Sequence, residues 1–151
     1  MNISKDGIEF IKAREGFRAV PYNDTAGNPT IGFGHKVLKG EHFGSIGSLE
    51  ATSLLLKDLD FPISVINNAV EVHLEQYQFD ALCSFVYNAG AHAFGTSTLL
   101  KALNEEKYGE AANEILKWCY ETKNGTKSRN EGLYRRRVAE RELFLTGKYT
   151  T

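Results

Sequence analysis

The segment from Phe17 to His35 constrains the fold most, because it interrupts a chain that otherwise has helical patterning. It carries two prolines and three glycines among residues that favour strands: Pro21, Gly27, Pro29, Gly32 and Gly34. Proline lacks a backbone donor and glycine reaches conformations that other residues avoid, so such a segment does not sustain a helix. We expect a hairpin or a small sheet here.

Apolar residues at helical spacing fill most of the remaining chain. Ser4 caps a predicted helix that ends at Gly16, and residues 36–48 are predicted to form a glycine-bearing loop. Pro62 either kinks or restarts the helix in which it lies. Further helices are predicted over residues 49–59, 74–90, 97–104, 108–121 and 132–147, with an exposed loop over residues 124–132.

This order of elements predicts an α+β protein with one mainly helical domain over residues 1–151. A small N-terminal lobe with a β-hairpin or sheet spans approximately residues 1–60, and a larger helical lobe spans residues 61–151. We expect a cleft between the lobes, which is a usual place for a site. Cys83 and Cys119 lie in apolar helical contexts, which favours buried free thiols over a disulfide.

Charge and hydropathy exclude several classes of function. The formal net charge is −1, from 18 Lys+Arg and 19 Asp+Glu, so no basic field favours a nucleic-acid partner. No apolar run is long enough for a membrane span, and residues 1–17 are charged throughout, so no signal peptide is expected. The four histidines form no metal-ligand motif, and we expect neither a metal nor another cofactor.

Glu15 is the first candidate for catalysis. It follows Ile8 and Ile11 at helical spacing, where an apolar residue would be expected. A carboxyl group withdrawn from water holds its proton to higher pH, as a general acid requires. Alternatively, a glutamate at a helix end reaches solvent or pairs with an arginine.

Asp24 and Thr30 are the second and third candidates. If the hairpin turns at Ala26–Gly27, the two residues become cross-strand neighbours on one face. A carboxylate beside a hydroxyl can hold and deprotonate a water molecule. Alternatively, Asp24 serves only the turn.

Strand alternation would place Gly32 and Gly34 on the same face as Thr30. Bare backbone there would let a bulky ligand such as a sugar chain approach closely, although glycines at a bend would give the same pattern. Two carboxyl groups across a cleft suit glycoside hydrolysis, in which one protonates the leaving oxygen and the other handles water or attacks carbon.

The spacing of Glu15, Asp24 and Thr30 resembles that of the phage-type lysozymes, endolysins of glycoside hydrolase family twenty-four. The segment REGFRAVPYNDTAGNPTIGFGH is similar to that family's first signature, and QYQFDALCSFVYNAG, FGTSTLLKALN and GLYRRRVAERELFL are similar to its later blocks. The resemblance covers most of the chain and is weakest over residues 36–48. It implies that the mainly helical α+β domain has a lysozyme-like fold.

The resemblance implies that Glu15 is the general acid and that Asp24 and Thr30 position a water that attacks with inversion. It implies cleavage of the β-1,4 bond between N-acetylmuramic acid and N-acetylglucosamine in bacterial peptidoglycan, and host-cell lysis. It further implies a monomer that stays in the host cytoplasm, without stable membrane insertion, until a holin releases it to the periplasmic cell wall.

Weaker candidates surround this set. The resemblance makes Tyr87, Asn88 and Thr98 substrate contacts, and Arg136 a partner of Glu15 that would favour its ionised form and so oppose the effect of burial. His35 is expected to fix the hairpin by pairing with an acid on the connecting helix.

Two other functions compete with hydrolysis. A non-catalytic wall-binding module of the same fold is disfavoured because all three catalytic positions hold the required residue types. A small helical nucleic-acid-binding protein that uses the arginine run at residues 135–137 is disfavoured by the net charge of −1.

Overall fold

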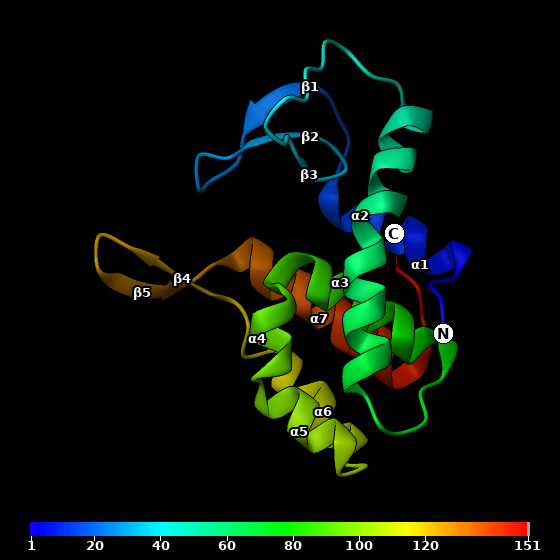
Figure 1. Cartoon of the computed structure of the whole chain (residues 1–151). Coiled ribbons are helices and arrows are strands. Elements are labelled where there is room, and N and C mark those ends of the chain that lie inside the picture. The colour runs from blue at the N-terminus through cyan, green and yellow to red at the C-terminus, as the bar shows by residue number, and fades with distance from the viewer. Residues whose placement is uncertain (151) are drawn as a thin grey trace.

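In the computed structural model, which describes residues 1–150, helices predominate and the strands form two small antiparallel sheets (Figure 1). This confirms the predicted α+β class. The elements in chain order are α1 (Lys5–Glu15), β1 (Arg18–Asn23), β2 (Pro29–Gly32), β3 (His35–Lys36), α2 (Ser48–Ala69), α3 (Gln76–Ala89), α4 (Ala91–Gly95), α5 (Thr98–Asn104), α6 (Tyr108–Ile115), β4 (Tyr120–Lys123), β5 (Thr126–Arg129) and α7 (Glu131–Thr146).

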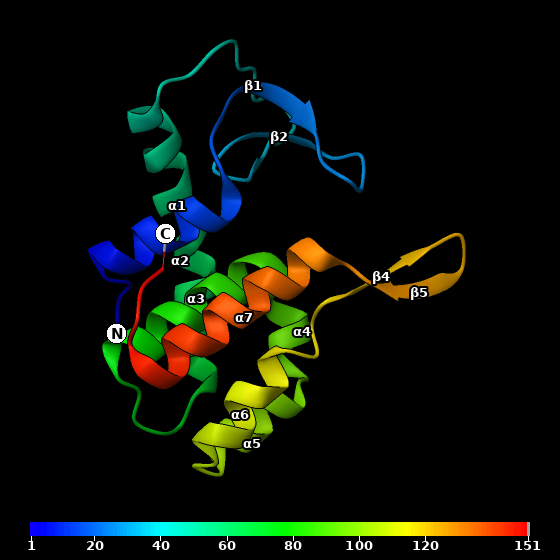
Figure 2. The same cartoon turned by 180° about the vertical axis from the view of Figure 1, so that it is seen from behind.

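The first sheet, in the order β1-β2-β3, lies at one end of the molecule, and α2 runs from it to the other helices (Figures 1 and 2). Helix α2 is continuous through Pro62, so a restarted helix is excluded. Leu55, Leu59 and Ile66 are buried along it on both sides of the proline. Packing of this apolar face offsets the one backbone hydrogen bond that proline cannot donate.

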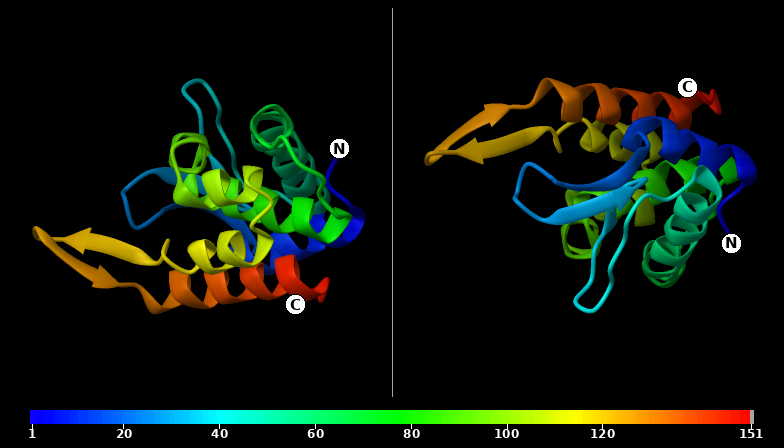
Figure 3. Two further views of the ribbon diagram at one scale, coloured as in Figure 1. Left: turned by 90° about the horizontal axis from the view of Figure 1, so that it is seen from below. Right: turned by 90° about the horizontal axis from the view of Figure 1, so that it is seen from above.

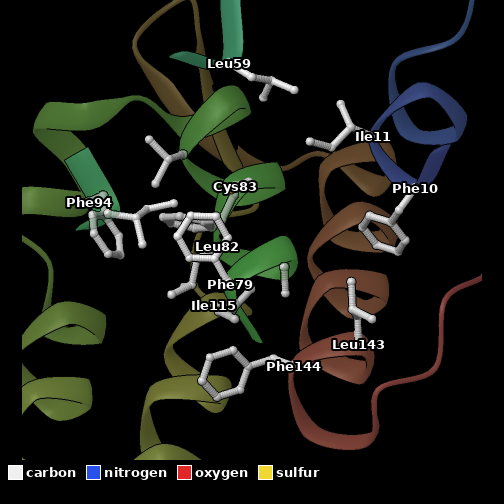
Figure 4. Packing of buried hydrophobic residues seen from close by; sticks show 14 of the residues in the cluster. Phe10, Ile11, Leu59, Phe79, Leu82, Cys83, Phe94, Ile115, Leu143 and Phe144 are labelled. Carbon is white, nitrogen blue, oxygen red and sulfur yellow. The ribbon is translucent and has the colours of Figure 1, made fainter. Parts of the chain in front are cut away.

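Helix α3 is the centre of the hydrophobic core (Figure 4). Every residue from Phe79 to Val86 is buried, a pattern typical of a helix that is surrounded by others. Phe10 and Ile11 of α1 and Leu143 of α7 also lie in this core. The helices that will carry the site are therefore held by one contiguous core. Within residues 1–150, no helix is both long and apolar enough to cross a lipid bilayer.

The helix predicted over residues 108–121 is confirmed only as far as Ile115, and the loop predicted over residues 124–132 is wrong where it contains a strand. Helix α6 ends at Ile115, and β4 and β5 then form a hairpin with exposed strands. Asn124 and Gly125 at its tip have φ values of 51° and 78°. An Asn-Gly pair with positive φ favours a two-residue hairpin turn, and this signal outweighs the helical spacing before it. The hairpin projects from the same side of the molecule as the β1–β2 hairpin (Figure 3).

Both cysteines of the predicted helices are buried free thiols, as expected. Burial raises the pKa of the Cys83 thiol well above its usual range, with a smaller contribution from the nearby charge of Asp80. Cys83 is therefore an apolar core residue, not a nucleophile.

Candidate active site

Glu15 is the last residue of α1, and the helix ends there because Gly16 has a φ of 73°. The Glu15 side chain is 16% exposed, and its Oε2 accepts a hydrogen bond of 2.5 Å from Nη1 of Arg136. The predicted contact between these two residues is present, although 121 positions separate them in the chain. Core packing of α1 and α7 against α3 brings them together.

The other oxygen of Glu15 faces the turn between β2 and β3. A Cβ atom built on Gly34 would lie 2.6 Å from Glu15 Oε1 and 3.3 Å from the Tyr87 hydroxyl. Tyr87 donates a hydrogen bond of 2.9 Å to the carbonyl oxygen of Phe33 and so ties α3 to the same turn. Bare backbone at Gly34 thus makes room for the carboxyl group itself.

A hollow of about 360 Å³ opens beside this turn, between the first sheet, α2 and the end of α3. Its lining includes Gly34, His35, Lys36, Asp58 and Tyr87. Leu38, Phe61 and Pro62 add apolar surface. A hollow with apolar walls and a few convergent polar groups suits a sugar chain.

The predicted direct pairing of Asp24 with Thr30 is wrong. Thr30 lies opposite Tyr22, because β1 and β2 are joined by a five-residue connection over residues 24–28 rather than a tight turn at Ala26–Gly27. The backbone N–H of Asp24 donates to Asn28 O. In this register Asp24 and Thr30 are diagonal neighbours on one face instead of direct partners.

The Asp24 carboxylate has two sets of partners. Its Oδ1 accepts backbone N–H bonds of 3.0 Å from Ala26 and 2.8 Å from Asn28, and its Oδ2 pairs with Lys36. The Lys36 ammonium group, followed by the Asn28 N–H, lowers the pKa of Asp24 to about 2. Asp24 is therefore ionised at neutral pH, as a group that receives a proton must be.

Thr30 is 1% exposed, and its hydroxyl donates a hydrogen bond of 2.9 Å to the carbonyl oxygen of Asn28. The hydroxyl proton is thus already used, whereas the oxygen retains acceptor capacity. Only this acceptor side of Thr30 remains for a water molecule.

The expectation that Gly32 and Gly34 present one open strand face is wrong. Strand β2 ends at Gly32, and both glycines have positive φ, so side-chain alternation does not continue. Gly32 is buried, and a Cβ on it would lie 3.1 Å from the Cβ of Ala51 on α2. Gly32 serves close packing of the sheet on the helix, not ligand approach.

His35 pairs with an acid on the connecting helix, as predicted. Its Nδ1 lies 2.7 Å from Oδ2 of Asp58, and its Nε2 lies 2.9 Å from Oε1 of Glu41, a partner that sequence reasoning missed. Burial lowers the pKa of His35, but the hydrogen bonds with Glu41 and Asp58 outweigh it, and the pKa is raised above its ordinary value. His35 joins the sheet, the loop after it and α2.

Tyr87, Asn88 and Thr98, the predicted substrate contacts, lie at two different hollows. Tyr87 lines the hollow beside Gly34, whereas Asn88 and Thr98 line a second hollow of about 530 Å³. Trp118 and Tyr120, at the base of the β4–β5 hairpin, supply aromatic surface to this second hollow. The end of α3 separates the two.

A buried charged network lies behind Glu15, and sequence reasoning missed most of it. Glu140 pairs with both Arg136 and Arg137, and Ser84 donates to it from α3 at 2.5 Å. The signal was present: Glu140 follows the two arginines by four and three residues, which is the spacing of helical ion pairs. Among residues 1–150, no cluster of three or more metal-ligating side chains occurs.

Glu15 lies against Gly34 and Asp24 pairs with Lys36, and both of these partner residues line the same hollow. Two carboxylates on separate segments are what glycoside hydrolysis needs. On this mainly helical frame with a small sheet they define a lysozyme-type glycoside hydrolase. The chain belongs to the phage lysozyme family, whose profile matches residues 12–140.

Individual relatives agree with this assignment. An endolysin of Acyrthosiphon pisum secondary endosymbiont phage 1 is 40% identical over 148 residues, which cover 95% of this chain and 98% of the relative. The solved endolysin from Escherichia coli O157:H7 phage FAHEc1 has a TM-score of 0.94 at 33% identity, covering 100% of this chain and 98% of its own. The muramidase domain of SpmX from Asticaccaulis excentricus has a TM-score of 0.89 at 38% identity, covering 96% and 98%.

Proposed function

We propose that this lysozyme is an endolysin that hydrolyses the β-1,4 bond between N-acetylmuramic acid and N-acetylglucosamine in peptidoglycan, with inversion at the anomeric carbon. The observation that carries the proposal is the placement of Glu15 at the end of α1. One of its oxygens is anchored by Arg136 and the other is directed to the rim of the hollow at Gly34. The muramidase domain of SpmX, which has the same fold, supports the choice of bond.

In the proposed reaction, Glu15 gives its proton to the glycosidic oxygen as the bond from that oxygen to the anomeric carbon breaks. A water molecule attacks the opposite face of that carbon and loses a proton to Asp24. Thr30 orients this water, because its oxygen can accept one of the two water protons while Asp24 accepts the other. A water that donates both protons presents its lone pair to the sugar.

In the cell, the enzyme acts on the periplasmic wall at the end of infection. A monomer is sufficient for this, since the proposed groups all come from one chain. Before lysis the protein stays in the host cytoplasm, and a holin is the partner that releases it.

Digestion of purified peptidoglycan tests the proposal. We expect mass spectrometry of the products to show new reducing ends at N-acetylmuramic acid, and NMR of fresh product to show the α-anomer first. Anhydro-muramic products would instead indicate a lytic transglycosylase, and an initial β-anomer would indicate retention through a covalent intermediate. Either result would overturn the proposed mechanism.

A further inference from the structure

Glu140 is a fully buried carboxylate in α7 that the proposed reaction does not use. It is 0% exposed. Its Oε2 accepts hydrogen bonds from Nε of Arg136 at 3.1 Å, from Nη2 of Arg137 at 3.2 Å and from Oγ of Ser84 at 2.5 Å. One carboxylate therefore binds two arginines and one hydroxyl group inside the helical lobe.

The two arginines extend from Glu140 toward the two hollows. Arg136 continues to the Glu15 carboxylate at 2.5 Å, and Arg137 continues to Oδ1 of Asn88 at 2.8 Å. Burial lowers the pKa of Arg136, but Glu140 and Glu15 outweigh it and raise the pKa, so Arg136 is always charged. Glu140 thus contacts Glu15 indirectly, through Arg136, which binds both carboxylates.

Stability alone gives a weak reason for this arrangement. Nε of Arg137 lies 2.8 Å from Oε1 of Glu140, yet these two buried atoms have no hydrogen-bond partner of good geometry within residues 1–150. Burying charges costs more than burying apolar groups of similar volume unless every polar atom is satisfied. A network that is incompletely satisfied, contacts Glu15 through Arg136 and lines the second hollow through Arg137 points to a role at the site.

We propose that Glu140 is a positioning residue for Glu15: it fixes Arg136 and neutralises part of its charge, so that Glu15 can carry a proton while the arginine still anchors it. This inference rests on the proposed function of Glu15 as the acid. It resolves the conflict between a permanent cation at 2.5 Å, which favours the ionised carboxylate, and a reaction that needs the protonated one.

The charges around Glu15 explain how Glu140 can favour its protonated state. Arg136 faces it from α7 and Tyr87 from α3, and Arg14 precedes it on α1. Glu140 itself faces Arg136 and Arg137 of its own helix and Ser84 of α3, and its charge also acts on Arg14. Within these groups, protonation of Glu15 leaves Glu140 as the remaining anion beside two buried guanidinium groups. Without Glu140 the protonated state of Glu15 would leave both positive charges uncompensated, which makes that state less favourable.

Two variants with opposite expected effects test the proposal. Glu140→Gln keeps the shape and the acceptor oxygen but removes the charge, so the pH at which the alkaline limb of the rate profile falls to half its height should decrease. Arg137→Gln removes a cation, so Glu140 then pairs with Arg136 alone. The pH of the alkaline limb should therefore rise. Glu142→Gln, two residues further along α7, is the matched control and should leave it unchanged.

The readout is direct titration of Glu15 by carboxyl ¹³C NMR on the folded full-length variants, together with the pH profile of kcat. We expect the alkaline limb of kcat to move with the NMR midpoint in each variant, while KM changes little in Glu140→Gln. A purely structural Glu140 predicts lower melting temperatures for both variants but no movement of the Glu15 midpoint, and that result would overturn the proposal.

Two further outcomes are informative. If Glu140→Gln does not fold, Arg137→Gln carries the test alone, and a midpoint that stays or falls overturns the proposal. If the NMR midpoints move as expected but the kcat profiles do not follow, the role of Glu140 toward Glu15 stands. The assignment of Glu15 as the acid then fails.

Discussion

The backbone of Gly34 approaches the Glu15 carboxyl group so closely that a Cβ atom at residue 34 would lie 2.6 Å from Oε1. Gly34→Ala should therefore displace the carboxyl group, and a misplacement of about 1 Å is worth roughly 100-fold in rate. Gly27→Ala is a matched control, since Gly27 has the same φ of 84° but nothing within 4 Å of its Cβ position. Each variant should lose about 1 kcal/mol of stability to positive φ, but only Gly34→Ala should lose the activity. Equal activity losses at equal melting temperature would contradict this reading.

Glu15→Gln should lower the rate of lysis of permeabilised bacteria by about 10²–10⁴-fold, because glutamine keeps the shape but cannot protonate the leaving oxygen. The circular dichroism spectrum and the melting temperature should change little. Glu9→Gln, at an exposed position of the same helix, provides the control for an unspecific loss of charge. A Glu15→Gln enzyme that lyses cells at the parent rate would exclude Glu15 as the acid.

Lys36→Met should raise the pKa of Asp24 from about 2 toward 3.8, because the lysine is the largest cause of its low value. The base must be ionised, so the acid limb of the rate profile should move to higher pH. At pH 3.5 the variant should lose up to about threefold in rate relative to its own rate at pH 6, a loss that the parent does not show. Lys39→Met, on the exposed loop nearby, should keep the parent profile. An unchanged acid limb in a folded Lys36→Met protein would remove Asp24 from the reaction.

Thr30→Val and Thr30→Ser separate the hydroxyl of Thr30 from its shape. Valine keeps the branched side chain but loses the oxygen proposed to accept a water proton, whereas serine keeps the oxygen and loses the methyl group. We expect the serine variant to retain partial activity and the valine variant to lose at least tenfold more, measured on purified peptidoglycan. Equal rates at matched stability would make the hydroxyl purely structural, bound to Asn28 O.

The His35 cluster should make the stability of the fold depend on pH. The pKa of His35 is raised, so its charged form contributes stability that is complete below its ordinary value near 6.5 and is lost as pH rises through the raised value. The pKa of Glu41 is lowered, first by the Leu38 N–H and then by His35, so its contribution is complete above 4.5. Both contributions are therefore present at pH 5.5.

His35→Gln should lower the free energy of unfolding by about 1.5–3 kcal/mol at pH 5.5, the value of hydrogen bonds to charged groups. By pH 9 the difference in free energy of unfolding between the variant and the parent should be smaller. Urea unfolding at the two pH values measures it, with His92→Gln, at an exposed position, as the control. A difference that grows with pH would show that His35 is held neutral.

Local chemistry made much of this fold predictable. Gly16, Gly90 and Gly147 end helices as the sequence indicates, each with positive φ. The pairing of His35 with α2 was also expected. The sequence does not predict the hairpin β4–β5, because apolar residues continue at helical spacing past Ile115 and mask the Asn-Gly turn signal that follows.

The candidate site was less predictable, because its contacts depend on tertiary packing. The spacing of Asp24 and Thr30 does not fix the strand register, which the five-residue connection over residues 24–28 sets. Ser84 meets Glu140 across 56 positions, and Lys36 meets Asp24 only after β3 has paired with β2. Contacts between residues so far apart in the chain produce no periodic pattern in the sequence from which they could be predicted.

The contact between Glu15 and Arg136 has a consequence for the order of events during translation. Among the described elements, α1 with Glu15 is synthesised before α7 with Arg136. A nascent chain that lacks α7 can form neither the anchor of Glu15 nor the interior that α7 shares with α3. We therefore expect a chain truncated before α7 to lack hydrolytic activity, and the site to form only after α7 has been synthesised.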